Sequence, residues 1–155
     1  MSFIRGVFTC WLLFFFSSVH AENLIQDSQS SYIKETAQRF VAALNERDLD
    51  KLKAEINEEL MVANFIETAD ISGPFSRRKQ IEKDMRSSLE NETFANWFNM
   101  LDTSNGVAKY RRIITIDGQM RGLVLLDFGD QGLNFLEAIV DPKSEKIYDF
   151  YVSAE

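Results

Sequence analysis

Three short turn sequences in the last third of the chain constrain its fold more than any other feature. They are Asp117-Gly118, residues 129–132 and residues 141–145. Glycine permits positive φ, Asp-Gly favours a tight hairpin, and Pro142 cannot donate a ladder hydrogen bond. Strands joined by such short connections are antiparallel neighbours. The turns therefore predict a four-stranded antiparallel meander, with strands at residues 107–116, 120–128, 133–140 and 147–152.

Apolar periodicity upstream of these strands predicts three helices. The second helix is short and is capped by Asp48, and the third extends from Ser76 to Leu101 with an interruption near Asn91. Residues 60–66 fit either a continued helix or a short strand. The first helix carries an apolar stripe at Ile33, Ala37, Phe40, Val41 and Leu44. The expected fold is an α+β cone, in which three helices pack on a curved meander, with a cystatin-like roll as the alternative.

The turn lengths also predict the register of the strands. They place Arg111, Val124, Glu137 and Phe150 in one row. We expect the face that contains this row to cover the core, although a single bulge would reverse the faces beyond it. Most of its residues are apolar: Ile113, Val124, Leu126, Phe128, Leu133, Phe135, Ile139, Phe150 and Val152.

Three polar residues interrupt this expected core face: Arg111, Glu137 and Tyr148. Arg111 and Glu137 lie two strand spacings apart, roughly 10 Å, and their side chains are long enough to meet above Val124. A charge on an apolar face must be paired or open to a pocket. The two residues therefore form either a structural ion pair or, together with Tyr148, the polar part of a ligand pocket.

The opposite face is too apolar for a free surface, and a sheet that is apolar on both sides needs cover on both. The helices can cover one face, so we expect a second copy of the chain to cover the other in a homodimer. In the predicted register Arg112 and Asp149 share a row and would frame this contact. The expected interface residues are Arg112, Leu123, Leu125, Asp149 and Tyr151.

The first 21 residues have the features of a secretory signal peptide. Arg5 precedes an apolar run at residues 7–16, and the small residues Val19 and Ala21 precede the expected cleavage site. The apolar run is too short to span a bilayer comfortably. We therefore expect an exported protein, periplasmic or secreted, with a polar leader at residues 22–31 and a single domain at residues 32–155.

Cleavage would remove the chain's only cysteine and its only histidine, Cys10 and His20. The mature protein would then have no disulfide, no Cys-His or Ser-His nucleophile, and no zinc site built from these residues. Loss of Arg5 changes the formal net charge from −7 to −8, which disfavours binding to nucleic acids and to anionic membrane surfaces. We expect no metal and no cofactor.

The segment FVAALNERDLDKL (residues 40–52) resembles the opening of the nuclear-transport-factor-two-like superfamily, also called SnoaL-like or ketosteroid-isomerase-like. In that superfamily a long helix runs into a short helix of the Asp-Leu-Asp-x-Leu type. Gly73 before the next helix and the ending KIYDFY (residues 146–151) are also similar to it, and the resemblance covers residues 33–152. It implies a cone-shaped α+β fold with an internal pocket, in a group that includes isomerases, dehydratases, hydrolases and many non-enzymatic modules.

Two functions follow from these observations. The first is an exported module that binds a small molecule or a protein without catalysis, because no nucleophile motif remains after cleavage. The alternative is a small enzyme of the isomerase or dehydratase type. It would use a pocket carboxylate such as Glu137 as general base and a tyrosine or arginine as electrophile.

Overall fold

The structure is a computed structural model that describes residues 27–69 and 75–154. Residues Tyr32–Glu155 form one compact unit. The expected signal peptide, residues 1–21, lies outside the described residues. Residues 27–31, which we expected to belong to a polar leader, are helical.

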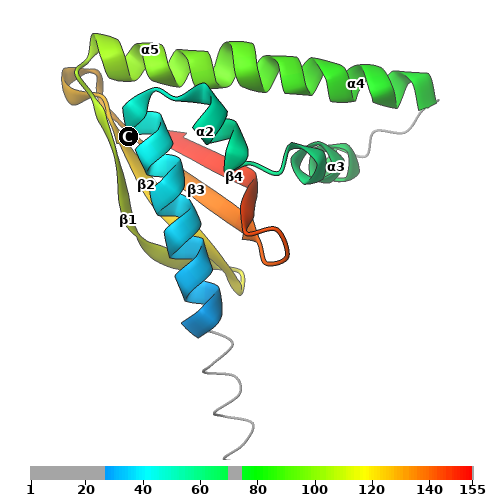
Figure 1. The fold of residues 1–155 in the computed structure, drawn as a ribbon, viewed down its shortest axis with the longest axis horizontal. Coiled ribbons are helices and arrows are strands. Elements are labelled where there is room, and N and C mark those ends of the chain that lie inside the picture. Colours follow the sequence, from blue (N-terminus) through cyan, green and yellow to red (C-terminus); the bar gives the residue numbers. More distant parts are fainter. Residues whose placement is uncertain (1–26, 70–74, 155) are drawn as a thin grey trace, which may run out of the picture. The chain divides into compact units, whose positions relative to one another are not determined.

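The predicted α+β class is confirmed, since a run of helices is followed by a four-stranded antiparallel sheet (Figure 1). The strands lie in the order in which they occur along the chain, so the sheet is the predicted meander. Their bounds are β1 Val107–Ile116, β2 Gln119–Asp127, β3 Leu133–Asp141 and β4 Lys146–Ala154. Asp117 and Gly118 both have positive φ, as a two-residue hairpin requires.

Among the described residues, the ambiguous segment 60–66 is helical and forms most of a helix, α3, that the sequence left open. The helix that ends at residue 46 is followed by α2 Leu49–Ala54, α3 Glu58–Thr68, α4 Phe75–Ser88 and α5 Ala95–Thr103. The expected interruption at Asn91 is a π-helical segment, η1 Leu89–Phe94, and Figure 1 shows that α4 continues through it into α5 as one long rod. None of the helices in the described ranges is long and apolar enough to cross a membrane.

Side-chain caps define where α2 and α3 begin. The Asp48 side chain accepts a hydrogen bond from the backbone N–H of Lys51, as predicted, and Asn57 does the same for Leu60. Such caps satisfy backbone donors that have no partner inside the helix.

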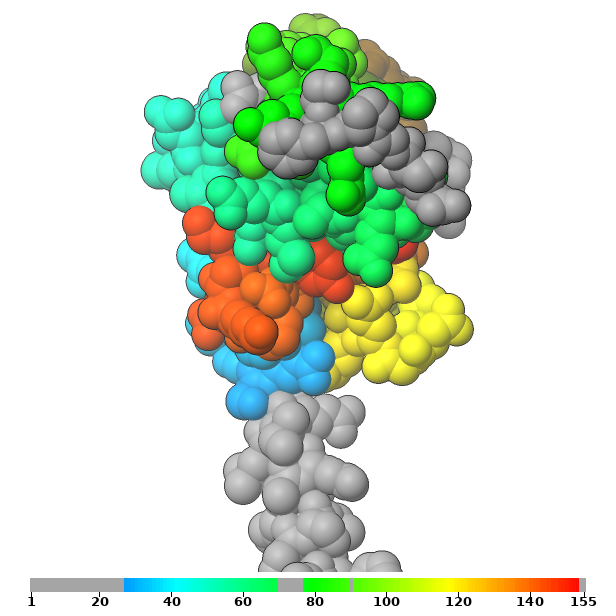
Figure 2. All heavy atoms as spheres, turned by 90° about the vertical axis from the view of Figure 1, so that its right-hand side faces the viewer, coloured from blue at the N-terminus to red at the C-terminus, as the bar shows by residue number. Residues whose placement is uncertain are grey.

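The linker between α2 and α3 covers the free edge of β4. The backbone N–H of Asn57 donates to the carbonyl of Ile147 over 2.8 Å, and the N–H of Ile147 donates to the carbonyl of Glu55 over 2.8 Å. An uncovered strand edge is a template for aggregation, so this short parallel bridge protects the β4 edge of the sheet. It also brings α3 against β4, and Figure 2 shows α3 between α4 and the hairpin that joins β3 to β4.

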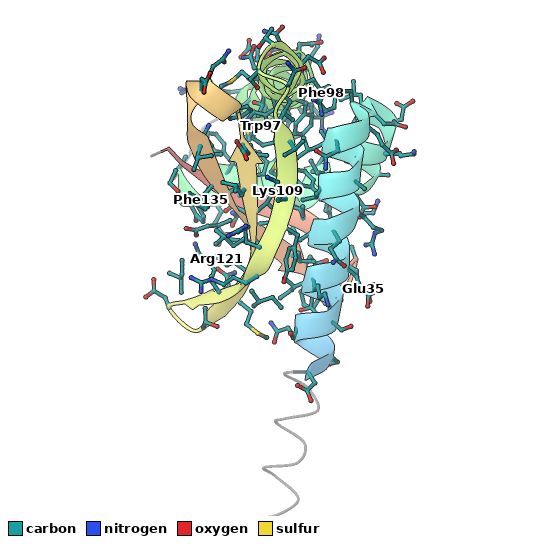
Figure 3. All side chains as sticks on the ribbon, turned by 90° about the vertical axis from the view of Figure 1, so that its left-hand side faces the viewer. Glu35, Trp97, Phe98, Lys109, Arg121 and Phe135 are labelled. Atoms are coloured by element: carbon teal, nitrogen blue, oxygen red, sulfur yellow. The ribbon has the colours of Figure 1, made fainter. Side chains whose placement is uncertain are left out.

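The core lies between the first helix and one face of the sheet. A Cβ at Gly122 would lie 3.0 Å from the Cβ of Ala37, so the absence of a side chain at Gly122 allows the helix to approach β2 closely. Trp97 closes one end of the core, where its ring lies 6.4 Å from Phe40 and 5.4 Å from Phe150, between centroids. We call the other side of the sheet, to which Phe135 and Arg121 point in Figure 3, the outer face.

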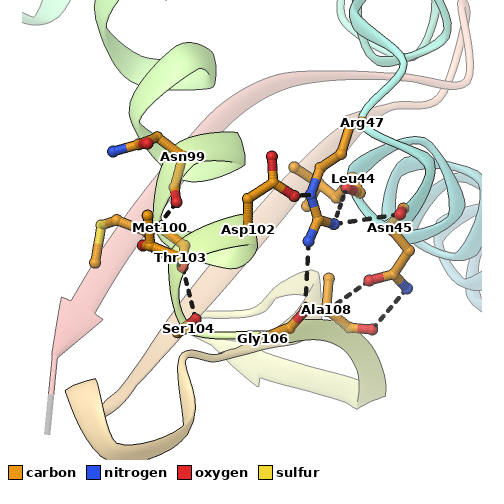
Figure 4. Close-up of polar contacts among 10 residues, drawn as sticks. All are labelled: Leu44, Asn45, Arg47, Asn99, Met100, Asp102, Thr103, Ser104, Gly106 and Ala108. Atoms are coloured by element: carbon orange, nitrogen blue, oxygen red, sulfur yellow. Dashed lines mark hydrogen bonds and ion pairs between the residues drawn. The ribbon is translucent and has the colours of Figure 1, made fainter.

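Polar contacts fasten the end of the first helix to the start of β1 (Figure 4). Asn45 donates from Nδ2 to the carbonyl of Ala108 over 3.0 Å and accepts at Oδ1 from the Ala108 N–H over 2.8 Å. Arg47 donates from Nε to Asp102 of α5 over 2.8 Å and from Nη1 to the carbonyl of Leu44 over 2.7 Å. These contacts join the first helix, α5 and β1 at one corner.

The predicted register is correct at the β1–β2 and β3–β4 turns and wrong at the β2–β3 connection. Ile116 is opposite Gln119 and Asp141 is opposite Lys146, as predicted. Leu133, however, is opposite Asp127 and not Phe128. β1 also has a bulge at Arg111 and β4 has one at Tyr148. These three irregularities change which residues share a face.

The predicted faces are therefore right for β2 and reversed for β3. Val124 and Leu126 belong to the core as expected, whereas Leu136 and Ala138, which we assigned to the opposite face, are also buried in it. Glu137 alternates with these two residues and lies on the outer face. Because side chains alternate with a period of two, the one-residue shift at the β2–β3 connection is enough to reverse the whole strand.

Candidate functional site

The outer face carries a row that crosses all four strands: Arg112, Leu123, Glu137 and Tyr151. The adjacent row contains Lys109, Leu125, Phe135 and Ser153. Arg112 and Lys109 therefore lie at the β1 end of a largely apolar strip, and Glu137 lies within the strip on β3. This face contains the candidate functional site.

The bulge in β1 places two arginines side by side at this face. Tyr110 is opposite Val124 and Arg112 is opposite Leu123, so Arg111 is the extra residue. A bulge turns two successive side chains toward one side of a sheet and often occurs next to a functional site. Both arginines accordingly line the same hollow.

This hollow is open to solvent and has a volume of about 400 Å³. Leu123 and Phe135 supply its apolar part, and both arginines are exposed beside them. Within the described ranges neither Arg111 nor Arg112 forms a hydrogen bond or an ion pair. Its lining consists of Tyr110, Arg111, Arg112, Leu123 and Phe135.

Lys109, which lies two residues before Arg111 on β1, is already paired with a carboxylate. Lys109 donates to Asp127 over 3.1 Å, and the pKa of Asp127 is lowered, chiefly by the backbone N–H of Gly129 and then by Lys109. Burial raises the pKa of the Tyr110 hydroxyl, so this tyrosine stays neutral in the physiological range. The charge offered to a ligand therefore comes from Arg111 and Arg112.

A second cluster on the outer face joins three strands. Arg121 donates from Nη1 to Glu137 Oε2 over 2.7 Å, and 13 % and 22 % of the two side chains are exposed. The Arg121 guanidinium carbon also lies 5.0 Å from the ring centroid of Tyr151. Its Nε is buried without a hydrogen-bond partner among the residues that the structure describes.

The predicted pairing of Arg111 with Glu137 is therefore wrong. Glu137 lies across Leu123 from Arg112, and its carboxylate is engaged by Arg121. The bulge at Arg111 and the shift before β3 cause this difference. Both residues do lie on one face, but it is the outer face and not the core face.

Tyr148, the third predicted pocket residue, lies apart from these two. Its hydroxyl accepts a hydrogen bond from Gln119 Nε2 over 3.3 Å, near the hairpin that joins β1 to β2. The structure thus does not assemble Arg111, Glu137 and Tyr148 into one pocket. Sequence reasoning missed Arg121, although its spacing of two from Leu123 places it on that residue's face.

By strand alternation the five predicted interface residues all belong to the outer face. Arg112 and Tyr151 are exposed, but Leu125 is only 8 % exposed, and Asp149 accepts a hydrogen bond from Asn64 of α3 over 2.9 Å. Arg112 and Asp149 do not share a row, because Asp149 is opposite Ile139. The homodimer and its five expected contact residues stay a prediction.

The chemistry available at this face is the binding of anions. The described ranges contain no cluster of three or more His, Cys, Asp or Glu residues that could hold a metal ion.

The chain was compared with known protein families, with known proteins and with solved structures, and none of them matches it.

Proposed function

We propose that the protein is an exported, non-catalytic binding module and that the outer face of its sheet binds an organic anion. The observation that carries this proposal is the pair of adjacent, unpaired guanidinium groups of Arg111 and Arg112 in one hollow. A guanidinium presents a planar fork of donors that matches the oxygens of carboxylate, phosphate or sulfonate groups. Two such forks on a rigid sheet can hold one anionic group from two sides.

The apolar side of the hollow adds a second requirement for the ligand. Leu123 and Phe135 lie beside the arginines, so the anionic group should be attached to an apolar body. A volume of about 400 Å³ lies in the range of small-molecule sites. Most of the exposed lining is polar, so the anionic group must carry the larger share of the affinity. The overall negative charge of the protein opposes anions at a distance, so the attraction must come from these two arginines.

The enzymatic alternative has less support. A general base must be within hydrogen-bond reach of its substrate, but Glu137 already accepts a hydrogen bond from Arg121 at 2.7 Å. Tyr148, a candidate electrophile, is bound to Gln119 instead of to this cluster. The resemblance to the nuclear-transport-factor-two-like superfamily is compatible with the proposal, since many of its members are non-enzymatic.

Anilinonaphthalene sulfonate, a sulfonate joined to an apolar aromatic body, is a suitable probe. We expect the folded protein to bind it with enhanced fluorescence, and the double substitution Arg111→Gln with Arg112→Gln to weaken binding at least about tenfold. Because both arginines are exposed, this estimate discounts each charge-assisted contact to about 0.7 kcal/mol. Two such contacts contribute about 1.4 kcal/mol, which is tenfold in affinity. Added salt should weaken binding to the wild type and have little effect on the variant.

The matched control removes the same charge elsewhere. Arg77 and Arg78 are adjacent, exposed arginines on α4, and changing both to Gln should leave the affinity unchanged. Circular dichroism should show that each variant is folded, because this dye also binds partly unfolded states. Equal affinity of the wild type and the Arg111/Arg112 variant would overturn the proposed site.

A further inference from the structure

A second hollow lies at the other edge of the sheet, where α3 and α4 meet β4. It has a volume of about 290 Å³ and opens to solvent. Figure 2 views the molecule from the side that displays α3 and α4. We call this hollow the α3–α4 groove; it is lined by Met61, Asn64, Phe65, Thr68, Met85, Leu89, Asp149, Phe150 and Tyr151.

Most of the groove is apolar, and two of its aromatic rings face water. Phe65 is 46 % exposed and Tyr151 is 52 % exposed, so both offer ring surface to a ligand. Met61 and Met85 line the same surface. Methionine side chains are flexible and polarisable, so such a surface adapts to apolar ligands of different shapes.

Asp149 is the one charged residue in this lining. Its Oδ2 accepts from Asn64 Nδ2 over 2.9 Å, and its Oδ1 accepts from the backbone N–H of Phe150 over 2.8 Å. Both donors are neutral, and Asp149 forms no ion pair in the ranges that the structure describes. Each carboxylate oxygen can accept two hydrogen bonds and accepts one here, so an acceptor position remains on each.

Arg121, the cation that contacts Tyr151, does not supply the missing charge. Arg121 lies over the ring of Tyr151, but its guanidinium is engaged by Glu137 at 2.7 Å. A half-buried carboxylate beside apolar and aromatic side chains is costly to desolvate unless a cation pairs with it. A bound ammonium group would provide that partner.

We infer that the α3–α4 groove binds an organic amine with an apolar chain. The protonated amine donates to Asp149 and lies against the rings of Phe65 and Tyr151, whose faces attract cations. The apolar chain lies along Met85 and Leu89. This site is separate from the arginine-lined hollow and has the opposite charge preference, so it does not depend on the function proposed for the outer face.

Three probes with the same ten-carbon chain and different head groups test the charge preference. They are decylamine, decanol and decanoate, each kept below the concentration at which it forms micelles. Calorimetric titration of the full-length protein should show that decylamine binds at least tenfold more tightly than either of the others. Two-dimensional NMR with decylamine should shift the signals of Asn64, Phe65 and Tyr151, but not those of Arg111 and Arg112.

Two variants separate the carboxylate from the apolar groove. Asp149→Asn removes the charge and keeps an oxygen that can accept from the Phe150 N–H, and Asn64 can turn its amide oxygen toward the new NH2 group. It should weaken decylamine binding at least tenfold and leave decanol binding unchanged. Thr68→Trp adds a bulky ring to the groove and should weaken binding of both probes. Asp127→Asn, which removes the same charge from β2, is the matched control and should leave decylamine binding to the folded protein unchanged.

Several results would overturn this inference. One is equal binding of decylamine, decanol and decanoate. Another is wild-type affinity of Asp149→Asn for decylamine in a folded sample. A third is an NMR shift pattern confined to residues outside the groove, which would show that the amine binds elsewhere.

Discussion

Arg121 donates a hydrogen bond to Glu137 over 2.7 Å, although the residue directly opposite Glu137 on β2 is Leu123. The contact is diagonal: Arg121 reaches from β2 toward the next row on β3, and its guanidinium also lies over Tyr151 of β4. One side chain therefore links three strands on the outer face. It also engages the carboxylate that we expected to pair with Arg111.

Removing either partner of this pair should destabilise the domain. Arg121→Met or Glu137→Leu leaves one charge on a largely covered surface, and each should lower the free energy of unfolding by about 2 kcal/mol. The double variant should lose clearly less than the sum, because no charge is left unpaired. Denaturant unfolding measures all three, and strictly additive losses would show that the two side chains act independently.

Asn45 should stabilise the corner between the first helix and β1. Asn45→Ala removes two hydrogen bonds to the backbone of Ala108, and we expect a loss of about 2 kcal/mol in the free energy of unfolding. Gln38→Ala, an exposed position on the same helix, is the control and should change stability little. Similar losses for both variants would contradict the role given to Asn45.

Stability should fall in acid because two turn aspartates are stabilised in their charged form. The Ser144 hydroxyl, followed by backbone N–H groups, lowers the pKa of Asp141 from its ordinary value of 3.8, and the Gly129 N–H is the largest cause of the lowered pKa of Asp127. Both groups bind protons more readily in the unfolded chain. Their stabilisation is therefore present above pH 3.8 and is lost as the pH falls through the folded-state pKa values.

Unfolding measured at a series of pH values checks this expectation. Asp141→Asn should lower stability at neutral pH and should flatten the acid limb of the curve. Glu67→Gln, a change at an exposed carboxylate outside the turns, should keep the limb as steep as in the wild type. An Asp141→Asn curve parallel to that of the wild type would show that Asp141 contributes nothing to the acid limb.

A homodimer, if it forms through the outer face, must compete with the anionic ligand. We expect light scattering at tens of micromolar to show a dimer and Leu123→Glu to give a folded monomer. Anilinonaphthalene sulfonate should then dissociate the dimer, because ligand and second copy bind the same surface. A monomer at every concentration tested would contradict the dimer and leave the anion site in place.

Export predicts a defined amino terminus. The apolar run at residues 7–16 and the small residues Val19 and Ala21 place cleavage before Glu22. Mass spectrometry of the protein recovered from the periplasm or medium should give a chain that begins there. An intact Met1 on protein recovered from the cytosol would contradict this prediction.

Local chemistry in the sequence was enough to predict the meander. Asp117-Gly118 adopts the two positive φ values of a tight hairpin, and Asp48 caps α2, each through contacts within a few residues. In the apolar stripe from Ile33 to Leu44, all residues but Val41 are buried in the core as expected, and Val41 is partly buried against it. Turns, caps and helix periodicity depend on neighbours along the chain, so they are readable without a structure.

The position of the site depended on the tertiary structure. Whether β1 has its bulge at Arg111 and whether Leu133 lies opposite Asp127 or Phe128 is decided by the fit of the sheet against the first helix, which involves residues far apart in the sequence. Each irregularity moves the register by one residue, and one residue reverses the direction of every later side chain. The sequence by itself therefore determined which residues form the strands, while only the packed sheet decided that Arg111, Arg112 and Glu137 lie together on its outer face.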